Sequence, residues 1–207
     1  AILKEKGISL ADTALTGEYY HRLRDLLYRY VDIFATSLKD LPGCDVMKVT
    51  IDTGNHPPIA KRNYRFNPDE KKIIREQIAE MEQAGIVRQE ASPWQAPIFL
   101  VDKVTPTGMG KRLIIDLRYL NAVTTMIKWP LITLDECIDG MAEQKPPPRF
   151  WASLDQKSGY YNICLDESAQ EKTGFSSPDG LSYIHTRLPM GHCNSVQWFS
   201  RIMSTVL

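Results

Sequence analysis

The chain has 207 residues, of which 43% are apolar and 24% charged, and its formal net charge is zero. These values are ordinary for a globular domain, and no apolar run approaches the roughly 20 residues of a membrane span. Because no signal-peptide pattern opens the chain, we expect an intracellular protein of the cytoplasm or nucleus without a membrane partner.

Cysteine usage argues against some classes of protein, and the charge distribution is compatible with others. The four cysteines are far apart and form no C-x-x-C pair, which argues against a zinc site and suits a reducing compartment. His185, His192 and Cys193 lie close together but lack a second ligand cluster, so we assign them no metal. Residues 56–120 carry a net charge of +3 and residues 121–207 a net charge of −2. This asymmetry suits phosphates held beside a divalent metal, and equally an ordinary solvated surface.

The first third of the chain predicts one helix and one short strand. Apolar residues recur at helical spacing over residues 18–34, and residues 46–51 have strand character. Asp52-Thr53-Gly54 matches the tripeptide of aspartic proteases, but the prolines that follow would break the strand such a site needs. We therefore interpret residues 52–54 as a plain turn.

The clearest helix spans residues 68–84. Asn67 is a good N-cap, Pro68 suits the first helical position, and Glu70 completes a capping box. Ile74, Ile78 and Met81 form one apolar stripe, and Gly85 ends the helix.

The rest of the chain alternates strands and helices. Residues 96–101 and 111–117 predict a hairpin with a flexible tip at 105–110, and residues 134–141 predict a helix before three prolines. Further strands are predicted at 149–155, 161–165 and 182–188, with a turn at 178–180. A final helix covers residues 195–207, with Val196, Phe199, Met203 and Val206 on one face. This order indicates an α+β fold.

One carboxylate stands out chemically. The apolar run at 150–154 leads into Asp155, and a Ser158-Gly159 turn and Tyr160 follow. Burying an unpaired charge is costly, so an acid in this position either faces a metal or is a surface residue that starts a turn. Lys103 and Arg112 flank the hairpin tip, where their cations can neutralise the oxygens of a triphosphate. Tyr160 offers an aromatic wall for a nucleoside.

From about residue 56 onward, six ordered motifs resemble the reverse transcriptase of gypsy-type long-terminal-repeat retrotransposons. In chain order they are Ser92-Pro93-Trp94-Gln95-Ala96-Pro97-Ile98; Arg112, Asp116, Arg118, Leu120 and Asn121; Leu154-Asp155 with Ser158-Gly159-Tyr160; Lys172-Thr173-Gly174-Phe175; Pro178-Asp179-Gly180; and Leu188-Pro189, Gly191 and Cys193-Asn194. Residues 1–54 resemble the segment that precedes the polymerase in such polyproteins.

The resemblance implies a right-hand polymerase fold, with fingers plus partial palm, truncated before the paired-aspartate motif. Residues 1–55 would be a linker segment with one helix, residues 56–130 the fingers, and residues 131–207 a partial palm carrying a second fingers hairpin at about 167–187. The implied partners are a template-primer of RNA or DNA, a deoxynucleoside triphosphate (dNTP) and the remainder of the Pol polyprotein. The implied setting is a cytoplasmic retrotransposon particle or the nucleus.

The resemblance also implies a role for each site residue. Asp155, helped by the backbone carbonyl of Gln156, would bind Mg²⁺, with Mn²⁺ as an alternative. Lys103 and Arg112 would hold the triphosphate. Tyr160 would exclude a 2′-hydroxyl. Met190 would line the nucleotide pocket. The basic fingers would follow the backbone of the template strand.

Several departures bear on activity. Leu117, His185 and Val196 differ from the family's preferred residues, Met190 replaces a common Phe or Gln, and the Y-x-D-D motif is absent. One Asp cannot hold two metal ions, so we expect this chain alone to be inactive. Two other interpretations stay open: a non-catalytic nucleic-acid-binding remnant or domesticated scaffold, and an unrelated structural domain.

Overall fold

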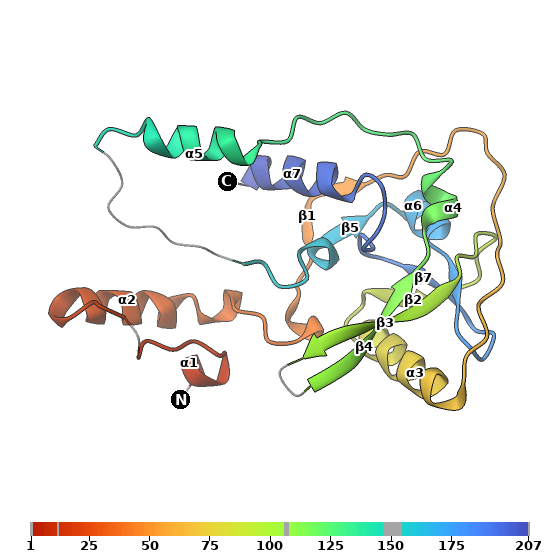
Figure 1. The fold of residues 1–207 in the computed structure, drawn as a ribbon, viewed down its shortest axis with the longest axis horizontal. Coiled ribbons are helices and arrows are strands. Elements are labelled where there is room, and N and C mark those ends of the chain that lie inside the picture. Colours follow the sequence, from red (N-terminus) through yellow and green to blue (C-terminus); the bar gives the residue numbers. More distant parts are fainter. Residues whose placement is uncertain (1, 12, 106–107, 147–154, 207) are drawn as a thin grey trace. The chain divides into compact units, whose positions relative to one another are not determined.

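The computed structural model describes residues 2–11, 13–105, 108–146 and 155–206. The chain forms two compact units, Ala1–Pro42 and Gly43–Leu207. The elements of the first unit are α1 (Ile2–Glu5), α2 (Gly17–Arg29) and two short 3₁₀ helices, η1 (Val31–Ile33) and η2 (Leu38–Asp40). Those of the second unit are β1 (Cys44–Val49), α3 (Pro68–Gln83), β2 (Val87–Gln89), β3 (Ile98–Thr105), β4 (Gly108–Ile115), α4 (Arg118–Asn121), α5 (Leu134–Ala142), η3 (Gly159–Asn162), β5 (Ile163–Leu165), α6 (Glu167–Lys172), β6 (Phe175–Ser176), β7 (Ser182–His185) and α7 (Ser195–Val206) (Figure 1).

The first unit confirms the predicted helix in shortened form. The α-helix α2 ends at Arg29, and the chain continues as the 3₁₀ helix η1. No residue of α2 is buried. Because β1 pairs with β5, the compact units divide after Pro42, ahead of the functional boundary that we place at residue 55. That boundary stays a prediction.

Local chemistry fixes α3 as predicted. The Asn67 side chain accepts a hydrogen bond from Glu70 N at 2.8 Å, and the Glu70 carboxylate accepts one from Asn67 N at 3.1 Å. Ile74, Ile78 and Met81 are buried, and Gly85 follows the helix with φ +66°. The capping box, the buried stripe and the terminating glycine all depend on residues within or next to the helix. The sequence alone is therefore sufficient to predict α3.

Asn67→Ala is expected to lower the free energy of unfolding by about 1 kcal/mol, because it removes the cap of α3. Asn67→Asp keeps a side-chain oxygen for Glu70 N and should leave stability nearly unchanged. Urea denaturation of the two variants measures the difference. Equal stability of the two would contradict the capping assignment.

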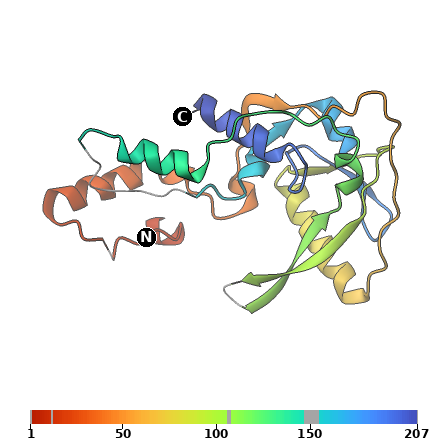
Figure 2. The same cartoon turned by 45° about the horizontal axis from the view of Figure 1, so that its top comes forward.

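The hairpin of β3 and β4 is longer than predicted. Eight residue pairs join the strands, from Ile98 with Ile115 to Thr105 with Gly108. Most of the tip at 105–110, which we expected to be flexible, is therefore paired strand, because the glycines at 108 and 110 tolerate extended pairing. Residues 106 and 107 lie outside the described part. On one side of this ribbon lies α3, whose Gln77 bonds to Lys111 O and Leu113 N at 2.8 Å each (Figure 2).

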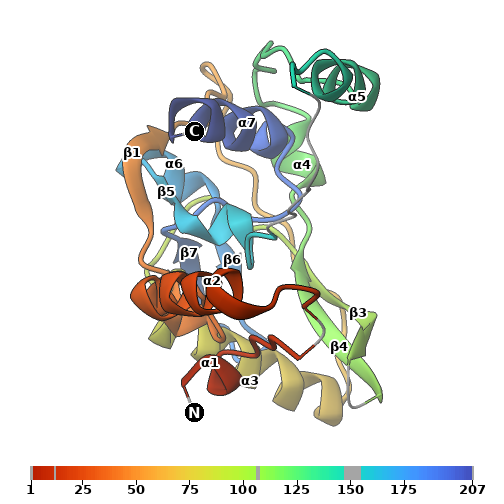
Figure 3. The ribbon, with the colours of Figure 1, turned by 90° about the vertical axis from the view of Figure 1, so that its left-hand side faces the viewer.

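The other strands form two small sheets. The middle strand β7 pairs antiparallel with both β2 and β6, and β1 pairs parallel with β5. After His185 the chain no longer pairs with β2 and runs beside β5 instead. There Leu165 N donates a hydrogen bond to Thr186 O, and Leu188 N donates one to Ile163 O. The predicted strand 182–188 therefore changes partners halfway. A view from the side shows α7 lying across β1 and β5 (Figure 3).

Three sequence predictions need correction. Residues 161–162 belong to the 3₁₀ helix η3, so the strand begins at Ile163. The helix α6 was missed, although Asp166 caps it by accepting from Ser168 N at 3.0 Å. On α7 the buried residues are Ser195, Trp198 and Ile202 instead of the predicted stripe, because the large Trp198 turns this face to the core. Val196 and Val206 are exposed.

The remaining predictions divide as follows. The turn at 52–54 is confirmed, since Asp52 Oδ1 accepts from Gly54 N at 2.9 Å. So are the helix near 134–141, observed as α5, and the turn at 178–180. The predicted strand 149–155 falls on residues outside the described part, except for Asp155. Among the described residues, no helix has the length and apolar character needed to cross a bilayer.

Candidate nucleotide and nucleic-acid site

The hairpin register brings Lys103 and Arg112 together. Lys103 pairs with Gly110, and Val101 pairs with Arg112. Because side chains alternate along a strand, Lys103, Val101 and Arg112 share one face of the ribbon. Both cations are exposed. Lys111 and Asp102 lie on the opposite face, where they form an ion pair at 3.3 Å.

Arg112 also reaches the segment that carries Tyr160. Burial raises the pKa of the neighbouring Tyr161, and the charge of the Arg112 guanidinium opposes that rise. The hairpin face and η3 are thus close enough for their side chains to interact electrostatically.

The position of Tyr160 is set by close packing. Ser158 adopts left-handed backbone geometry, with φ +47°, to begin the turn. The Tyr160 and Phe199 rings meet edge to face, with centroids 5.7 Å apart. A Cβ at Gly159 would lie 2.9 Å from the Phe199 ring, so a larger residue there would push this ring from its place. The contact between η3 and α7 therefore holds Tyr160 in place.

Asp155 and Gln156 are both exposed at the start of this turn. A carboxylate and a backbone carbonyl are the hard oxygen ligands that Mg²⁺ prefers, so the donor set suits that ion. A single carboxylate is too little for two metals. Within the described residues no group of three or more His, Cys, Asp or Glu side chains is arranged to hold a metal. The metal role of Asp155 stays a prediction.

Two asparagines fix the loop that bears Met190. Asn121 donates to Gly191 O at 2.9 Å and accepts from Cys193 N at 2.9 Å. Buried Asn194 accepts from Ile127 N at 3.1 Å and donates to Thr125 O at 2.9 Å. The asparagine that closes the Arg112–Asn121 motif thus connects the hairpin region to the loop of Met190. Met190 itself is half-buried.

An ion pair between the buried Asp116 and the exposed Arg118 lies in the same motif. Arg118 donates to both carboxylate oxygens of Asp116, at 2.8 and 2.6 Å. Asp116 is 3% exposed, and these bonds hold its pKa below the usual range. Tyr64, whose ring meets Phe99 edge to face, lies 3.5 Å from the same carboxylate. The acid therefore has a structural partner and is not a metal ligand in this arrangement.

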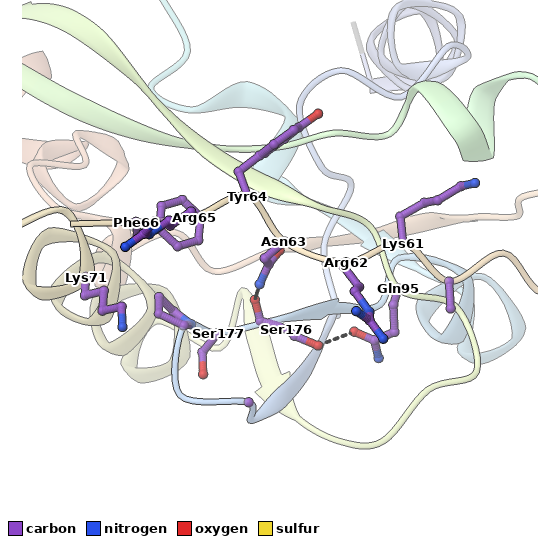
Figure 4. A pocket seen from close by; sticks show the side chains of 13 residues that line it. Lys61, Arg62, Asn63, Tyr64, Arg65, Phe66, Lys71, Gln95, Ser176 and Ser177 are labelled. Carbon is purple, nitrogen blue, oxygen red and sulfur yellow. Dashed lines mark hydrogen bonds between the residues drawn. The ribbon is translucent and has the colours of Figure 1, made fainter. Parts of the chain in front are cut away.

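Sequence reasoning missed one feature, a basic groove formed by residues 60–66 with Lys71, Gln95, Ser176, Ser177, Pro178 and Gly180 (Figure 4). The available signal was the alternation of basic and aromatic residues in Lys61-Arg62-Asn63-Tyr64-Arg65-Phe66. No local pattern indicated that the turn after β6 would lie against it.

Relatives of known identity agree with the motif analysis. The chain is 32% identical over 187 residues to the retrovirus-related Pol polyprotein from transposon gypsy of Drosophila melanogaster, covering 89% of this chain and 18% of that protein. The Pol polyprotein from transposon 412 of the same species is 30% identical over 186 residues, covering 88% of this chain and 15% of the relative. The chain thus spans less than a fifth of these relatives. No family model matches it.

Solved structures agree in fold. The foamy viral protease-reverse transcriptase in complex with RNA/DNA hybrid superposes with a TM-score of 0.78 at 20% identity, covering all of this chain and 26% of that one. The foamy viral protease-reverse transcriptase dRH in complex with double-stranded DNA gives a TM-score of 0.77 at 21% identity, covering 100% of this chain and 34% of that one. The chain belongs to the family of gypsy-type retrotransposon Pol polyproteins, as a segment with the fold of a reverse transcriptase.

Proposed function

We propose that this chain is the fingers and first half of the palm of an RNA-directed DNA polymerase. The complete enzyme adds deoxynucleotides to a primer on an RNA or DNA template. In this proposal the fingers cover residues 56–130 and the partial palm residues 131–207. The β6–β7 hairpin supplies the second fingers hairpin, and the first 55 residues are a linker.

Each site residue has a distinct role in this proposal. Lys103 and Arg112 neutralise the triphosphate, and the Tyr160 ring rejects a 2′-hydroxyl on the incoming sugar. Met190 lines the nucleotide pocket. Asp155 and the carbonyl of Gln156 hold Mg²⁺ or Mn²⁺, which in phosphoryl transfer neutralises developing charge on the phosphate oxygens.

One observation supports this most directly. Arg112 shares a hairpin face with Lys103 and acts electrostatically on Tyr161, the neighbour of Tyr160. In this proposal, the cations for the phosphates and the aromatic ring for the sugar come from segments more than 45 positions apart in the sequence. An unrelated structural domain has no need for this arrangement.

Nucleotide binding tests the proposal. Arg112→Ala is expected to weaken binding of a magnesium-dNTP complex about tenfold, because one charge-assisted contact to phosphate is lost. Lys111→Ala is the matched control, since Lys111 is adjacent but on the opposite face of the ribbon. Fluorescence titration with a labelled dNTP provides the affinities. Equal affinities for the two variants would remove the basis of the proposal.

The isolated chain is expected not to extend a primer. Two-metal transfer needs carboxylates that hold two cations about 3.5–4 Å apart, and Asp155 supplies one. Primer extension with Mg²⁺ and Mn²⁺ measures this directly. Extension that Asp155→Asn abolishes would show that the chain is catalytically complete. The remainder of the polyprotein is the partner that we expect to supply the other carboxylates.

A non-catalytic nucleic-acid-binding remnant is the second candidate. The fully buried His185 and the exposed Val196, where the family pattern has other residues, favour it. In that case nucleic-acid binding would fall equally for Lys103→Ala and Arg112→Ala and would be steeply salt-dependent. Asp155→Asn would then have no effect on Mg²⁺-dependent nucleotide binding.

A further inference from the structure

One side chain of α3 is bonded to the backbone of β4 on either side of Arg112. Gln77 Nε2 donates a hydrogen bond to Lys111 O at 2.8 Å, and Leu113 N donates one to Gln77 Oε1 at 2.8 Å. Strand β3 pairs with β4 along one edge, with Val101 opposite Arg112. The Gln77 amide therefore lies along the other edge of β4, in the place where a third strand would bond.

The residue type suits this position. The Lys111 carbonyl needs a donor and the Leu113 N–H needs an acceptor, and the glutamine amide carries one of each on a single planar group. A glutamate in the same place would turn an ionised carboxylate, which has no proton to donate, toward the Lys111 carbonyl. Gln77 is thus matched to two backbone groups of β4 and to no side chain.

The helix that carries Gln77 is itself fixed to the rest of the unit. Ile74 and Ile78, which flank Gln77 on α3, are both buried. Arg75 donates two hydrogen bonds, of 2.7 and 2.6 Å, to Asp179 in the turn between β6 and β7. The helix therefore supports Gln77 rigidly as it reaches β4, beside which α3 runs (Figure 2).

The two bonds hold both peptide groups that flank Arg112. Lys111 O belongs to the peptide group before Arg112, and Leu113 N belongs to the one after it. The Leu113 side chain is buried and, because side chains alternate along a strand, it anchors the opposite face of the ribbon. Within the described residues no ion pair orients the Arg112 guanidinium. The direction of this side chain is therefore set by the backbone that Gln77 holds.

We propose that Gln77 is a positioning residue for nucleotide binding: by holding both peptide groups beside Arg112, it aims the guanidinium at the phosphates of a dNTP. The inference rests on the proposed function, in which Arg112 and Lys103 neutralise the triphosphate. Gln77 itself does not touch the nucleotide. A cation that is already aimed loses less conformational entropy when it binds phosphate, so the two bonds of Gln77 raise the affinity.

Gln77→Met is the test variant, because methionine has a similar length and helix propensity but no amide. Gln83→Met is the matched control: Gln83 is exposed on the same helix, and within the described residues its side chain forms no hydrogen bond. Urea denaturation checks that both variants are folded. Hydrogen exchange reports on the bond itself, and the Leu113 amide should exchange at least about tenfold faster in Gln77→Met than in Gln83→Met.

Fluorescence titration with a labelled dNTP and Mg²⁺ measures the effect on binding. Gln77→Met is expected to weaken binding about fivefold, and Gln83→Met to leave it unchanged. Gln77→Met is then combined with Arg112→Ala and, separately, with Lys103→Ala. It should have no further effect once Arg112 is alanine, because no guanidinium remains to be aimed. In the Lys103→Ala chain, where Arg112 is still present, its effect should persist.

A purely structural role of Gln77 gives a different pattern. If the whole hairpin were loosened, Gln77→Met would weaken dNTP binding by the same factor in the parent, the Arg112→Ala and the Lys103→Ala chains, and the inference would be overturned. Equal dNTP affinities of Gln77→Met and Gln83→Met would also overturn it. So would a Leu113 amide that exchanges at the same rate in both variants.

The comparison of Arg112→Ala with Lys111→Ala decides the proposed function separately. If Arg112→Ala binds dNTP more weakly than Lys111→Ala while Gln77→Met and Gln83→Met bind it equally, the inference about Gln77 fails and the proposed function stands. If Arg112→Ala and Lys111→Ala bind dNTP equally, the proposed function fails, and the positioning role fails with it even where the Leu113 amide exchanges faster.

Discussion

Gly174→Ala is expected to lower the free energy of unfolding by more than about 3 kcal/mol, a large part of the total stability of a typical domain. A Cβ at this position would lie 2.1 Å from Trp94 O and 2.8 Å from the Ser92 side chain. Trp94 O belongs to the backbone and cannot rotate away. The clash falls where Ala96 N donates to Gly174 O at 2.8 Å and Ser92 Oγ donates to Glu171 O at 2.6 Å.

Gly140→Ala is the matched control, because nothing lies within 4 Å of a Cβ there. Gly140 is in α5, where alanine is favoured over glycine by up to about 1 kcal/mol, so this variant should be slightly more stable. Circular dichroism during urea denaturation compares the two variants. A folded Gly174→Ala protein with an unchanged midpoint would show that the Ser92–Ile98 segment does not pack on Gly174 as the structure has it.

That contact joins two motifs that are far apart in the sequence. Ser92-Pro93-Trp94 and Thr173-Gly174-Phe175 are about 80 residues apart, yet each supplies the space or hydrogen-bond partner that the other needs. Motif matching found both and predicted their order. It could not indicate that Gly174 is required for sterics, because that requirement depends on the distance between chain segments.

Helices and strands that are determined by residues close in the sequence could be predicted. The capping box of α3 and the alternating hairpin residues act within a few positions, so α3 and β3–β4 followed from the sequence. By contrast, η3 depends on the left-handed Ser158 and on packing against Phe199, forty residues away. Strand character at 161–165 was therefore only half correct. Tertiary packing overrode local preference there.

The candidate site divides in the same way. Two-residue periodicity implies that Lys103 and Arg112 share a face once the register is known. The basic groove could not be predicted, because Arg62 and Ser177 lie in segments that tertiary contacts such as the Asn63–Ser176 bond, 113 positions apart, bring together. Asp155 was identified from the apolar run before it, but all five residues of that run, 150–154, lie outside the described part. The metal-binding role of Asp155 is therefore tested by measuring Mg²⁺-dependent nucleotide binding of Asp155→Asn.

Two buried histidines are expected to make the chain lose stability in mild acid. His185 is 0% exposed and His192 is 4% exposed, and within the described residues neither Nε2 atom has a hydrogen-bond partner. Burial lowers the pKa of each to about 4, from an ordinary value of 6.5. The folded state thus binds fewer protons than the unfolded state between these values. Stability is complete above pH 6.5 and falls as the pH drops toward 4.

The expected loss at pH 5 is about 2 kcal/mol for each histidine relative to pH 7. Carboxylates do not obscure this range. The pKa of Asp116, for example, is lowered from 3.8 by its bonds to Arg118, so its contribution is lost only below about pH 4. Urea denaturation at several pH values between 7 and 4.5 measures the profile.

His185→Phe isolates one of the two contributions. The ring of His185 lies 5.4 Å from that of Phe175, so phenylalanine keeps the aromatic packing while removing the group that titrates. The variant should lose about 2 kcal/mol less than the parent chain between pH 7 and 5. His21→Gln, at an exposed position of α2, should leave the profile unchanged. If His185→Phe shows the same pH dependence as the parent, then protonation of His185 is not what destabilises the fold, because a neutral aromatic ring in the same place has no proton to gain.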